Sequence, residues 1–234
     1  MTKDIKTFDF INGEILLFDK PLYWTSFYLV KKVRGVILKK LNIKKIKVGH
    51  AGTLDPLATG LMIICTGAAT KTIEQYQNLP KVYEAEIVLG ATTPSFDLET
   101  EIDQRFEVPD IQNEEMLQLI NQFKGTYEQE PPIYSAKFIN GKRAYEYARK
   151  GTDIQLKKNS ITIYNIDIMS FKSPLLKLKV KCSKGTYIRS LARDIGIKLN
   201  AGAYLSALKR TEIGDYTINK SLSFNDFENY IKIM

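Results

Sequence analysis

One stretch of the sequence, residues 48–67, constrains the fold more than any other part of the chain. It holds a polar loop next to two short runs of aliphatic and β-branched residues, 46–48 and 61–66. Runs of this kind, bounded by glycines, are typical of buried strands. The stretch therefore predicts two strands with a polar loop between them.

The loop contains Asp55 and also His50, which is the single histidine of the chain. Pro56 disfavours a helical backbone at Asp55, while Gly52 and Gly60 allow backbone angles that are closed to other residues. Two interpretations stay open at this point. Asp-Pro is an ordinary way to begin a turn, and a carboxylate in a shaped loop is also a candidate for chemistry.

The composition is that of an ordinary globular enzyme, with 44% hydrophobic and 26% charged residues in a chain of 234. This length can bury a proper core, and it predicts one large domain or one domain with a small appendage. Cys65 and Cys182 lie far apart in apolar runs, which predicts reduced core residues and leaves no basis for a zinc site.

No targeting or membrane segment is evident in the sequence. The first residues lack the apolar core of a signal peptide, and no apolar run approaches the ~18 residues that a membrane span requires. We therefore expect a cytoplasmic protein with no membrane partner and no metal.

The net charge of +8 is unevenly distributed along the chain. Residues 31–47 contain eight basic side chains and no acidic one, and residues 172–189 contain six more, again without an acid. A segregated positive field attracts a polyanion by releasing its counterions, so nucleic acid is the natural partner. A lysine-rich surface that only keeps the protein soluble is the alternative.

Periodicity and turn signals predict further elements on both sides of the central loop. The expected elements are a strand at 14–18, a helix that Thr25 or Ser26 caps, a strand at 82–90, a helix opened by Pro109 and Asp110, an antiparallel pair at 160–171 and 175–182, a helix with Thr186 as its cap, and a helix at 223–234. Alternating strands and helices leave the α/β class open.

Residues 49–60, Gly-His-Ala-Gly-Thr-Leu-Asp-Pro-Leu-Ala-Thr-Gly, resemble the catalytic-loop motif of the bacterial tRNA pseudouridine-55 synthases, the TruB family. Residues 182–189, Cys-Ser-Lys-Gly-Thr-Tyr-Ile-Arg, and residues 19–21, Asp-Lys-Pro, are similar to two more motifs of that family. The resemblance runs from residue 13 to about residue 214. Residues 92–100 depart from the family pattern, with Pro-Ser-Phe at 94–96.

This resemblance implies an α+β protein with the pseudouridine synthase fold. A central mixed, mostly antiparallel sheet would be flanked by helices, with a short C-terminal tail and no full PUA domain. Residues 1–234 would form a single catalytic domain, with about 200–234 as a small C-terminal appendage.

The resemblance also implies the activity, which is isomerisation of uridine 55 in the T loop of tRNA to pseudouridine by base flipping and an Asp-dependent break and re-formation of the glycosidic bond. No cofactor is expected, because the reaction needs neither redox chemistry nor a metal. The expected partner is the tRNA T stem-loop, and the expected state is a monomer. A non-catalytic tRNA-binding or folding protein, or a guide-dependent pseudouridine synthase, remains an alternative.

The site residues follow from the same resemblance, position by position. Asp55 is expected to be catalytic, with Arg189 across a cleft and Tyr83 packed on the base. The residues expected to bind substrate are His50, Lys20, Tyr187 and Leu208, and the candidates for contact with the RNA backbone are Lys31, Arg143 and Arg149. Exposed basic residues on helices are also commonly just solvated.

Overall fold

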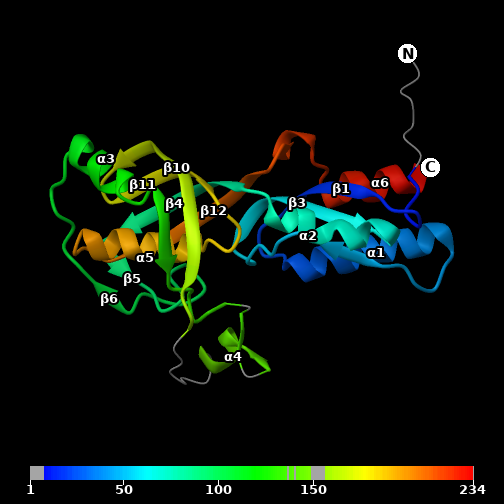
Figure 1. Cartoon of the computed structure of the whole chain (residues 1–234), viewed down its shortest axis with the longest axis horizontal. Coiled ribbons are helices and arrows are strands. Elements are labelled where there is room, and N and C mark those ends of the chain that lie inside the picture. Colours follow the sequence, from blue (N-terminus) through cyan, green and yellow to red (C-terminus); the bar gives the residue numbers. More distant parts are fainter. Residues whose placement is uncertain (1–7, 136, 140, 149–155, 234) are drawn as a thin grey trace, which may run out of the picture. The chain divides into compact units, whose positions relative to one another are not determined.

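The computed structural model describes residues 8–135, 137–139, 141–148 and 156–233. The chain forms two compact units, which we describe separately. Unit 1 comprises Met1–Lys81 and Lys209–Met234, and unit 2 comprises Val82–Leu208. Two strands, β4 (Lys81–Leu89) and β12 (Ala203–Ile213), contribute residues to both (Figure 1).

Unit 1 is built around the long strand β3 (Ala58–Thr66). β1 (Ile15–Lys20) pairs with it antiparallel, with Ile15 opposite Cys65 and Lys20 opposite Gly60. β2 (Val48–His50) also pairs with it antiparallel. The two strands expected around the central loop are therefore confirmed, although the first of them lies two residues later than predicted and includes His50.

The helices of unit 1 begin with α1 (Ser26–Leu41). The hydroxyl of Thr25 accepts a hydrogen bond from the Tyr28 backbone N–H at 2.9 Å, so Thr25 is the cap. The elements that complete the unit are the 3₁₀ turn η1 (Gly67–Thr72), α2 (Ile73–Asn78), β13 (Tyr216–Thr217), the 3₁₀ turn η2 (Ile218–Lys220) and α6 (Phe224–Ile233).

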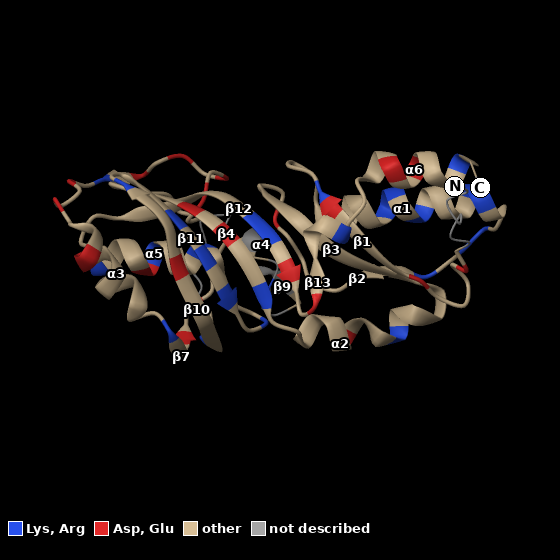
Figure 2. Ribbon diagram, turned by 90° about the horizontal axis from the view of Figure 1, so that it is seen from above, with Lys and Arg blue, Asp and Glu red and all other residues tan. Residues whose placement is uncertain are grey.

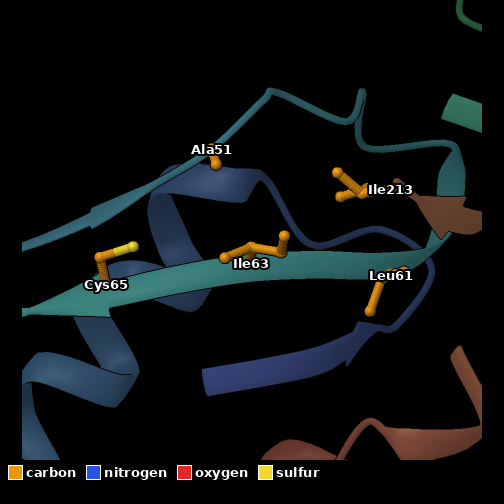
Figure 3. Packing of buried hydrophobic residues seen from close by; sticks show 5 residues of the cluster. All are labelled: Ala51, Leu61, Ile63, Cys65 and Ile213. Carbon is orange, nitrogen blue, oxygen red and sulfur yellow. The ribbon is translucent and has the colours of Figure 1, made fainter. Parts of the chain in front are cut away.

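One part of the unit 1 core lies on the face of β3 that carries Leu61, Ile63 and Cys65, because alternate residues of a strand point the same way. A cluster of five buried side chains packs there, and Figure 3 shows its members: Ala51, Leu61, Ile63, Cys65 and Ile213. Ala51 comes directly after β2, and Ile213 is the last residue of β12. The cluster therefore joins the two sequence segments of unit 1, because Ala51 belongs to the first and Ile213 to the second.

Unit 2 contains the long hairpin formed by β10 (Asn159–Lys172) and β11 (Leu175–Cys182), which confirms the expected antiparallel pair. β7 (Gly125–Gln129) pairs with the other edge of β10. The hydrogen-bonded order in this unit is β12, β4, β11, β10, β7. The longer helices of this unit are α3 (Asn113–Asn121) and α5 (Ile188–Lys198).

Short elements complete unit 2. β5 (Ala91–Thr92) pairs with β6 (Gln104–Arg105), and β8 (Phe138–Ile139) pairs with β9 (Lys142–Arg143). The helix α4 (Ala144–Ala148) follows β9. α3 starts later than predicted because Gln112 and Glu115 form a reciprocal capping box that sets its first turn. The mixed, mostly antiparallel sheet flanked by helices confirms the expected fold class.

Thr186 does not cap α5, contrary to expectation. The cap position is Tyr187, which makes no capping bond through its side chain. The Thr186 hydroxyl instead donates to the Ser183 carbonyl at 3.0 Å, closing the turn before the helix. In the described ranges, no helix combines the length and the apolar character that crossing a bilayer would demand.

The docking of α6 gives a direct test of the packing in unit 1. Phe227 is fully buried, and its ring lies 5.2 Å from that of Phe18 and 6.3 Å from that of Phe10, both edge to face. We expect Phe227→Ala to lower the free energy of unfolding by about 3 to 5 kcal/mol, because it leaves a cavity among aromatic rings. Chemical denaturation measures the change.

Ile233→Ala on the same helix is the control, because Ile233 is 81% exposed. Its effect should stay within about 0.5 kcal/mol. Equal effects of the two substitutions would show that α6 does not dock through Phe227.

Candidate active site

Residues 51–57, the Asp55 loop, connect β2 to β3 in unit 1. Arg210 of β12 donates to two carbonyls of this loop, that of Gly52 at 3.1 Å and that of Thr53 at 3.5 Å. Both acceptors come just before Asp55. The first arm of the loop is therefore held from β12, a strand more than 150 positions later in the chain.

Ser26, the first residue of α1, holds the middle of the loop. Its buried hydroxyl accepts from the Leu54 backbone N–H at 2.8 Å and donates to the Leu54 carbonyl at 2.9 Å. One side chain thus satisfies both backbone groups of the residue before Asp55. This arrangement fixes the direction in which the chain enters Asp55, because a buried backbone group without a partner would be costly.

The second arm of the loop is held in the same way. The Asp55 carbonyl accepts from the Ala58 backbone N–H at 3.1 Å, and the Pro56 carbonyl accepts from the Tyr23 backbone N–H at 2.8 Å. Five successive carbonyls, from residue 52 to residue 56, thus each accept a hydrogen bond. Asp55 itself is only half-buried, so a fixed backbone carries a carboxylate that is still partly exposed.

Lys20 at the end of β1 is fully buried beside this loop. Its ammonium donates to the carbonyls of Pro21 at 3.0 Å, Trp24 at 2.6 Å and Pro56 at 3.5 Å. Burial lowers the pKa of Lys20 to about 8, although the Asp55 carboxylate acts in the opposite direction. The structure thus directs Lys20 toward the backbone around Asp55, and the predicted effect of its charge on substrate phosphates stays a prediction.

His50 is half-buried at the end of β2, just before the Asp55 loop. Its Nδ1 atom is buried and has no hydrogen-bond partner among the described residues. Burial lowers the pKa of His50, and the nearby charge of Arg210 lowers it further. The Gly52 backbone beside the ring acts in the opposite direction.

Arg189 lies on α5 in unit 2 and is 4% exposed. Its guanidinium contacts the Asp97 carboxylate at 3.5 Å and donates to the carbonyls of Ser95 at 3.3 Å and Tyr134 at 2.9 Å. The pair is buried on both sides. Sequence reasoning missed Asp97, since a lone acid after the divergent residues 94–96 carries no local signal.

The remaining unit 2 candidates lie on three elements. Tyr83 is 9% exposed on β4, and Leu208 is half-buried on β12. Tyr187 is anchored through its backbone, because its N–H donates to the side chain of Gln129 at 2.8 Å and its carbonyl accepts from that amide at 3.1 Å. Gln129 is 1% exposed, so the start of α5 is bound firmly to β7.

Of the three candidates for RNA-backbone contact, only Lys31 has a described side chain. Lys31 is exposed on α1, along which Figure 2 shows several basic residues. Arg143 belongs to β9, of which we describe only the backbone, and Arg149 lies outside the described residues. Within the described part of the chain, no three His, Cys, Asp or Glu side chains gather as a metal site requires.

The structure therefore groups the predicted residues by unit. Asp55, Lys20 and His50 gather in unit 1, while Arg189, Tyr83 and Tyr187 belong to unit 2. The pairing of Asp55 with Arg189 stays a prediction.

The chain matches two domain families along most of its length. Residues 39–188 match the N-terminal domain of TruB family pseudouridylate synthases, and residues 189–234 match the tRNA pseudouridylate synthase B C-terminal domain. The chain belongs to the TruB family. This confirms the resemblance seen in the sequence and makes the protein an enzyme. The C-terminal match covers the segment that was expected to be a small appendage.

Relatives support the TruB assignment over nearly the whole chain. The tRNA pseudouridine synthase B of Phocaeicola vulgatus is 53% identical, with 95% of each chain covered. That of Parabacteroides distasonis is 51% identical over 96% of this chain and 95% of its own. That of Flavobacterium johnsoniae is 45% identical over 96% of this chain and 98% of its own.

Solved structures share the fold of this TruB-family chain. A chain of a Cbf5-Nop10-Gar1 complex matches with a TM-score of 0.67 and 25% identity, covering 92% of this chain. A chain of an H/ACA RNP bound to a substrate RNA containing 2'-deoxyuridine matches with a TM-score of 0.67 and 24% identity, covering 94%. This chain spans about half, 54%, of the length of either.

The pKa of Lys20 predicts a pH dependence of stability. Below pH 8 both states of the protein carry the proton, and the folded state bears the whole cost of burying it. Between about 8 and the ordinary value of 10.5, the folded state has released the proton that the unfolded chain still binds. The Lys20 contribution to the free energy of unfolding therefore rises with pH in this window.

Denaturation of the wild type and of Lys20→Met at several pH values measures this contribution as a difference. The wild type should gain roughly 1 kcal/mol relative to the variant for each pH unit between about 8 and 10. Lys220→Met, which removes an exposed lysine, should track the wild type. A difference that falls with rising pH would contradict the assignment.

The buried pair of Arg189 and Asp97 predicts a stability effect in unit 2. Asp97→Asn removes the carboxylate charge that contacts the buried Arg189 guanidinium at 3.5 Å. We expect a loss of about 3 kcal/mol in the free energy of unfolding, measured by urea denaturation. Asp110→Asn, which alters an exposed carboxylate, is the control, and equal stability of the two variants would show that the pair contributes nothing.

Proposed function

We propose that this protein isomerises uridine 55 in the T loop of tRNA to pseudouridine, with the Asp55 carboxylate as the essential group. The observation that carries the proposal is the Asp55 loop, whose five successive bonded carbonyls hold a partly exposed carboxylate beside the buried charges of Lys20 and Arg210. The names of the relatives support the tRNA substrate.

The reaction rearranges bonds within one nucleotide. The bond between N1 of uracil and C1′ of the ribose breaks, the base turns, and a new bond forms between C5 and C1′. C5 loses its hydrogen as a proton and N1 gains one, so no electrons enter or leave. Asp55 supplies the negatively charged oxygen that such chemistry requires, and no cofactor is needed.

The uridine must leave its stack in the folded T loop before the carboxylate can reach it, at a cost of a few kcal/mol. Aromatic stacking contributes roughly 1 to 3 kcal/mol per base, which is of the right size to offset that cost. We assign this role to Tyr83, with Tyr187 and Leu208 lining the pocket. His50, with its unbonded Nδ1, would occupy the space that the base vacates.

Binding of the RNA backbone would rest on the exposed basic residues. Lys177, Lys179 and Lys181 alternate along the exposed face of β11, and α1 carries a second group of lysines (Figure 2). Such charges attract RNA by releasing its counterions. Lys31, Arg143 and Arg149 are the proposed backbone contacts, and a cytoplasmic monomer remains the expected form.

Two other functions lead to different outcomes. A tRNA-binding or folding protein without catalysis has no need of a carboxylate fixed in a positive surrounding, because that charge repels the RNA. A guide-dependent synthase would need additional RNA, and one solved structure of similar fold is an H/ACA RNP bound to a substrate RNA. Activity on a bare T-arm stem-loop without added RNA or protein excludes the guide-dependent alternative.

Release of tritium from tRNA labelled at C5 of uridine tests the proposal. Asp55→Asn should abolish the release, because the amide cannot act as the anion, while binding of the tRNA should persist. Asp215→Asn, which changes an exposed carboxylate of unit 1, is the matched control and should keep its activity. Normal turnover by Asp55→Asn would disprove the role of this residue.

A further inference from the structure

Arg210 is a buried cation that no carboxylate neutralises among the described residues. Its side chain is 1% exposed, and its three acceptors are all backbone carbonyls: Leu61 at 2.8 Å, Gly52 at 3.1 Å and Thr53 at 3.5 Å. A buried charge without a counter-charge is expensive. The arrangement therefore calls for an explanation other than the stability of the fold.

The three carbonyls lie on both sides of Asp55 along the chain. Those of Gly52 and Thr53 come before it, and that of Leu61 belongs to β3 after it. A planar guanidinium offers several donors in a fixed geometry, so a single side chain can hold the first arm of the loop and β3 at a set separation. A lysine ammonium has no such planar fork.

Two glycines lie next to Arg210, and one of them makes room for its backbone. Gly60 has a φ of +108°, and a Cβ atom there would overlap the backbone of Arg210. Gly52 has a φ of +122°, and a Cβ atom there would lie 3.5 Å from the Arg210 guanidinium. Both positions disfavour other residues for reasons of backbone conformation, and both bring the chain close to Arg210.

The charge of Arg210 also reaches the groups around the loop. It contributes to lowering the pKa of Lys20, at the end of β1, and that of His50, at the end of β2. Lys20 in turn interacts with the Asp55 carboxylate. The guanidinium thus adds a positive charge to the group of titratable residues that includes Asp55.

We propose that Arg210 is a positioning residue for Asp55, and that it acts by locking the first arm of the Asp55 loop to β3 at the separation that presents the carboxylate to the flipped uridine. This inference rests on the proposed function and adds a residue to it. Loss of the lock would misplace the carboxylate without removing it. A displacement of ~1 Å can cost about 100-fold in rate, whereas binding of the RNA uses other residues.

The experiment compares the wild type with Arg210→Lys and Arg210→Ala, and uses Lys220→Met as the matched control for removal of a cation from unit 1. Single-turnover tritium release at saturating enzyme gives the rate of the chemical step, and filter binding gives the Kd for tRNA. Thermal unfolding and circular dichroism report the fold. Each variant is measured with and without a few millimolar guanidinium chloride or ethylguanidine.

A positioning role predicts a rate about 100-fold lower in Arg210→Ala, with the Kd for tRNA unchanged and the fold retained. Arg210→Lys should recover only part of this loss, because it keeps the charge without the fork. Added guanidinium should raise the rate of Arg210→Ala alone. A residue that only supports the fold would lower the melting temperature and gain nothing specific from guanidinium.

The inference is overturned if Arg210→Lys matches the wild type in rate, if the Kd rises in step with the loss of rate, or if both variants fail to fold. These outcomes are distinct from failure of the proposed function, which would show as a wild type that binds tRNA and releases no tritium. If the wild type is active and Arg210→Ala releases tritium at the same rate, the proposed function holds and only the positioning role of Arg210 is disproved.

Discussion

The structure of unit 1 depends on satisfying the backbone of the Asp55 loop with donors from buried side chains. A loop that turns between two strands has no ladder partners for its carbonyls, and each buried carbonyl left without a hydrogen bond costs free energy. Lys20, Ser26 and Arg210, the loop clamp, provide these partners. The conformation around Asp55 follows from where those three side chains lie.

The loop clamp joins segments that are distant in sequence. Lys20 ends β1, Ser26 begins α1, and Arg210 belongs to β12, so the three donors reach the loop from three separate elements. Each also sits at a well-packed position, with 3% or less of the residue exposed. A site held in this way is preorganised, because the cost of ordering the loop is met when the protein folds rather than when RNA binds.

Unit 2 uses the same physical device at Arg189. This guanidinium also takes two backbone carbonyls, from Ser95 and Tyr134, but it adds a carboxylate, that of Asp97. The two buried arginines therefore differ in charge balance. Arg189 pairs with a carboxylate and ties α5 to the loop at 94–97, whereas Arg210 brings its positive charge to the backbone of the Asp55 loop, where an anionic group has a function in the proposed reaction.

Local patterns in the sequence determined much of the secondary structure and singled out Asp55 as the candidate reactive group. A helix capped by Thr25 or Ser26, the β10 and β11 hairpin and the loop around Asp55 follow from neighbouring residues, because capping, alternation and turn chemistry act over a few positions. The motifs around Asp55 and Arg189 also identified the family.

Only the tertiary structure decided which distant side chains hold those motifs. Three contacts show this: Arg210 with Gly52, Arg210 with Gly60, and Arg189 with Asp97, which span roughly 90 to 160 positions. Local sequence patterns cannot predict such contacts. They arise from packing and from the need of buried charges and carbonyls for partners.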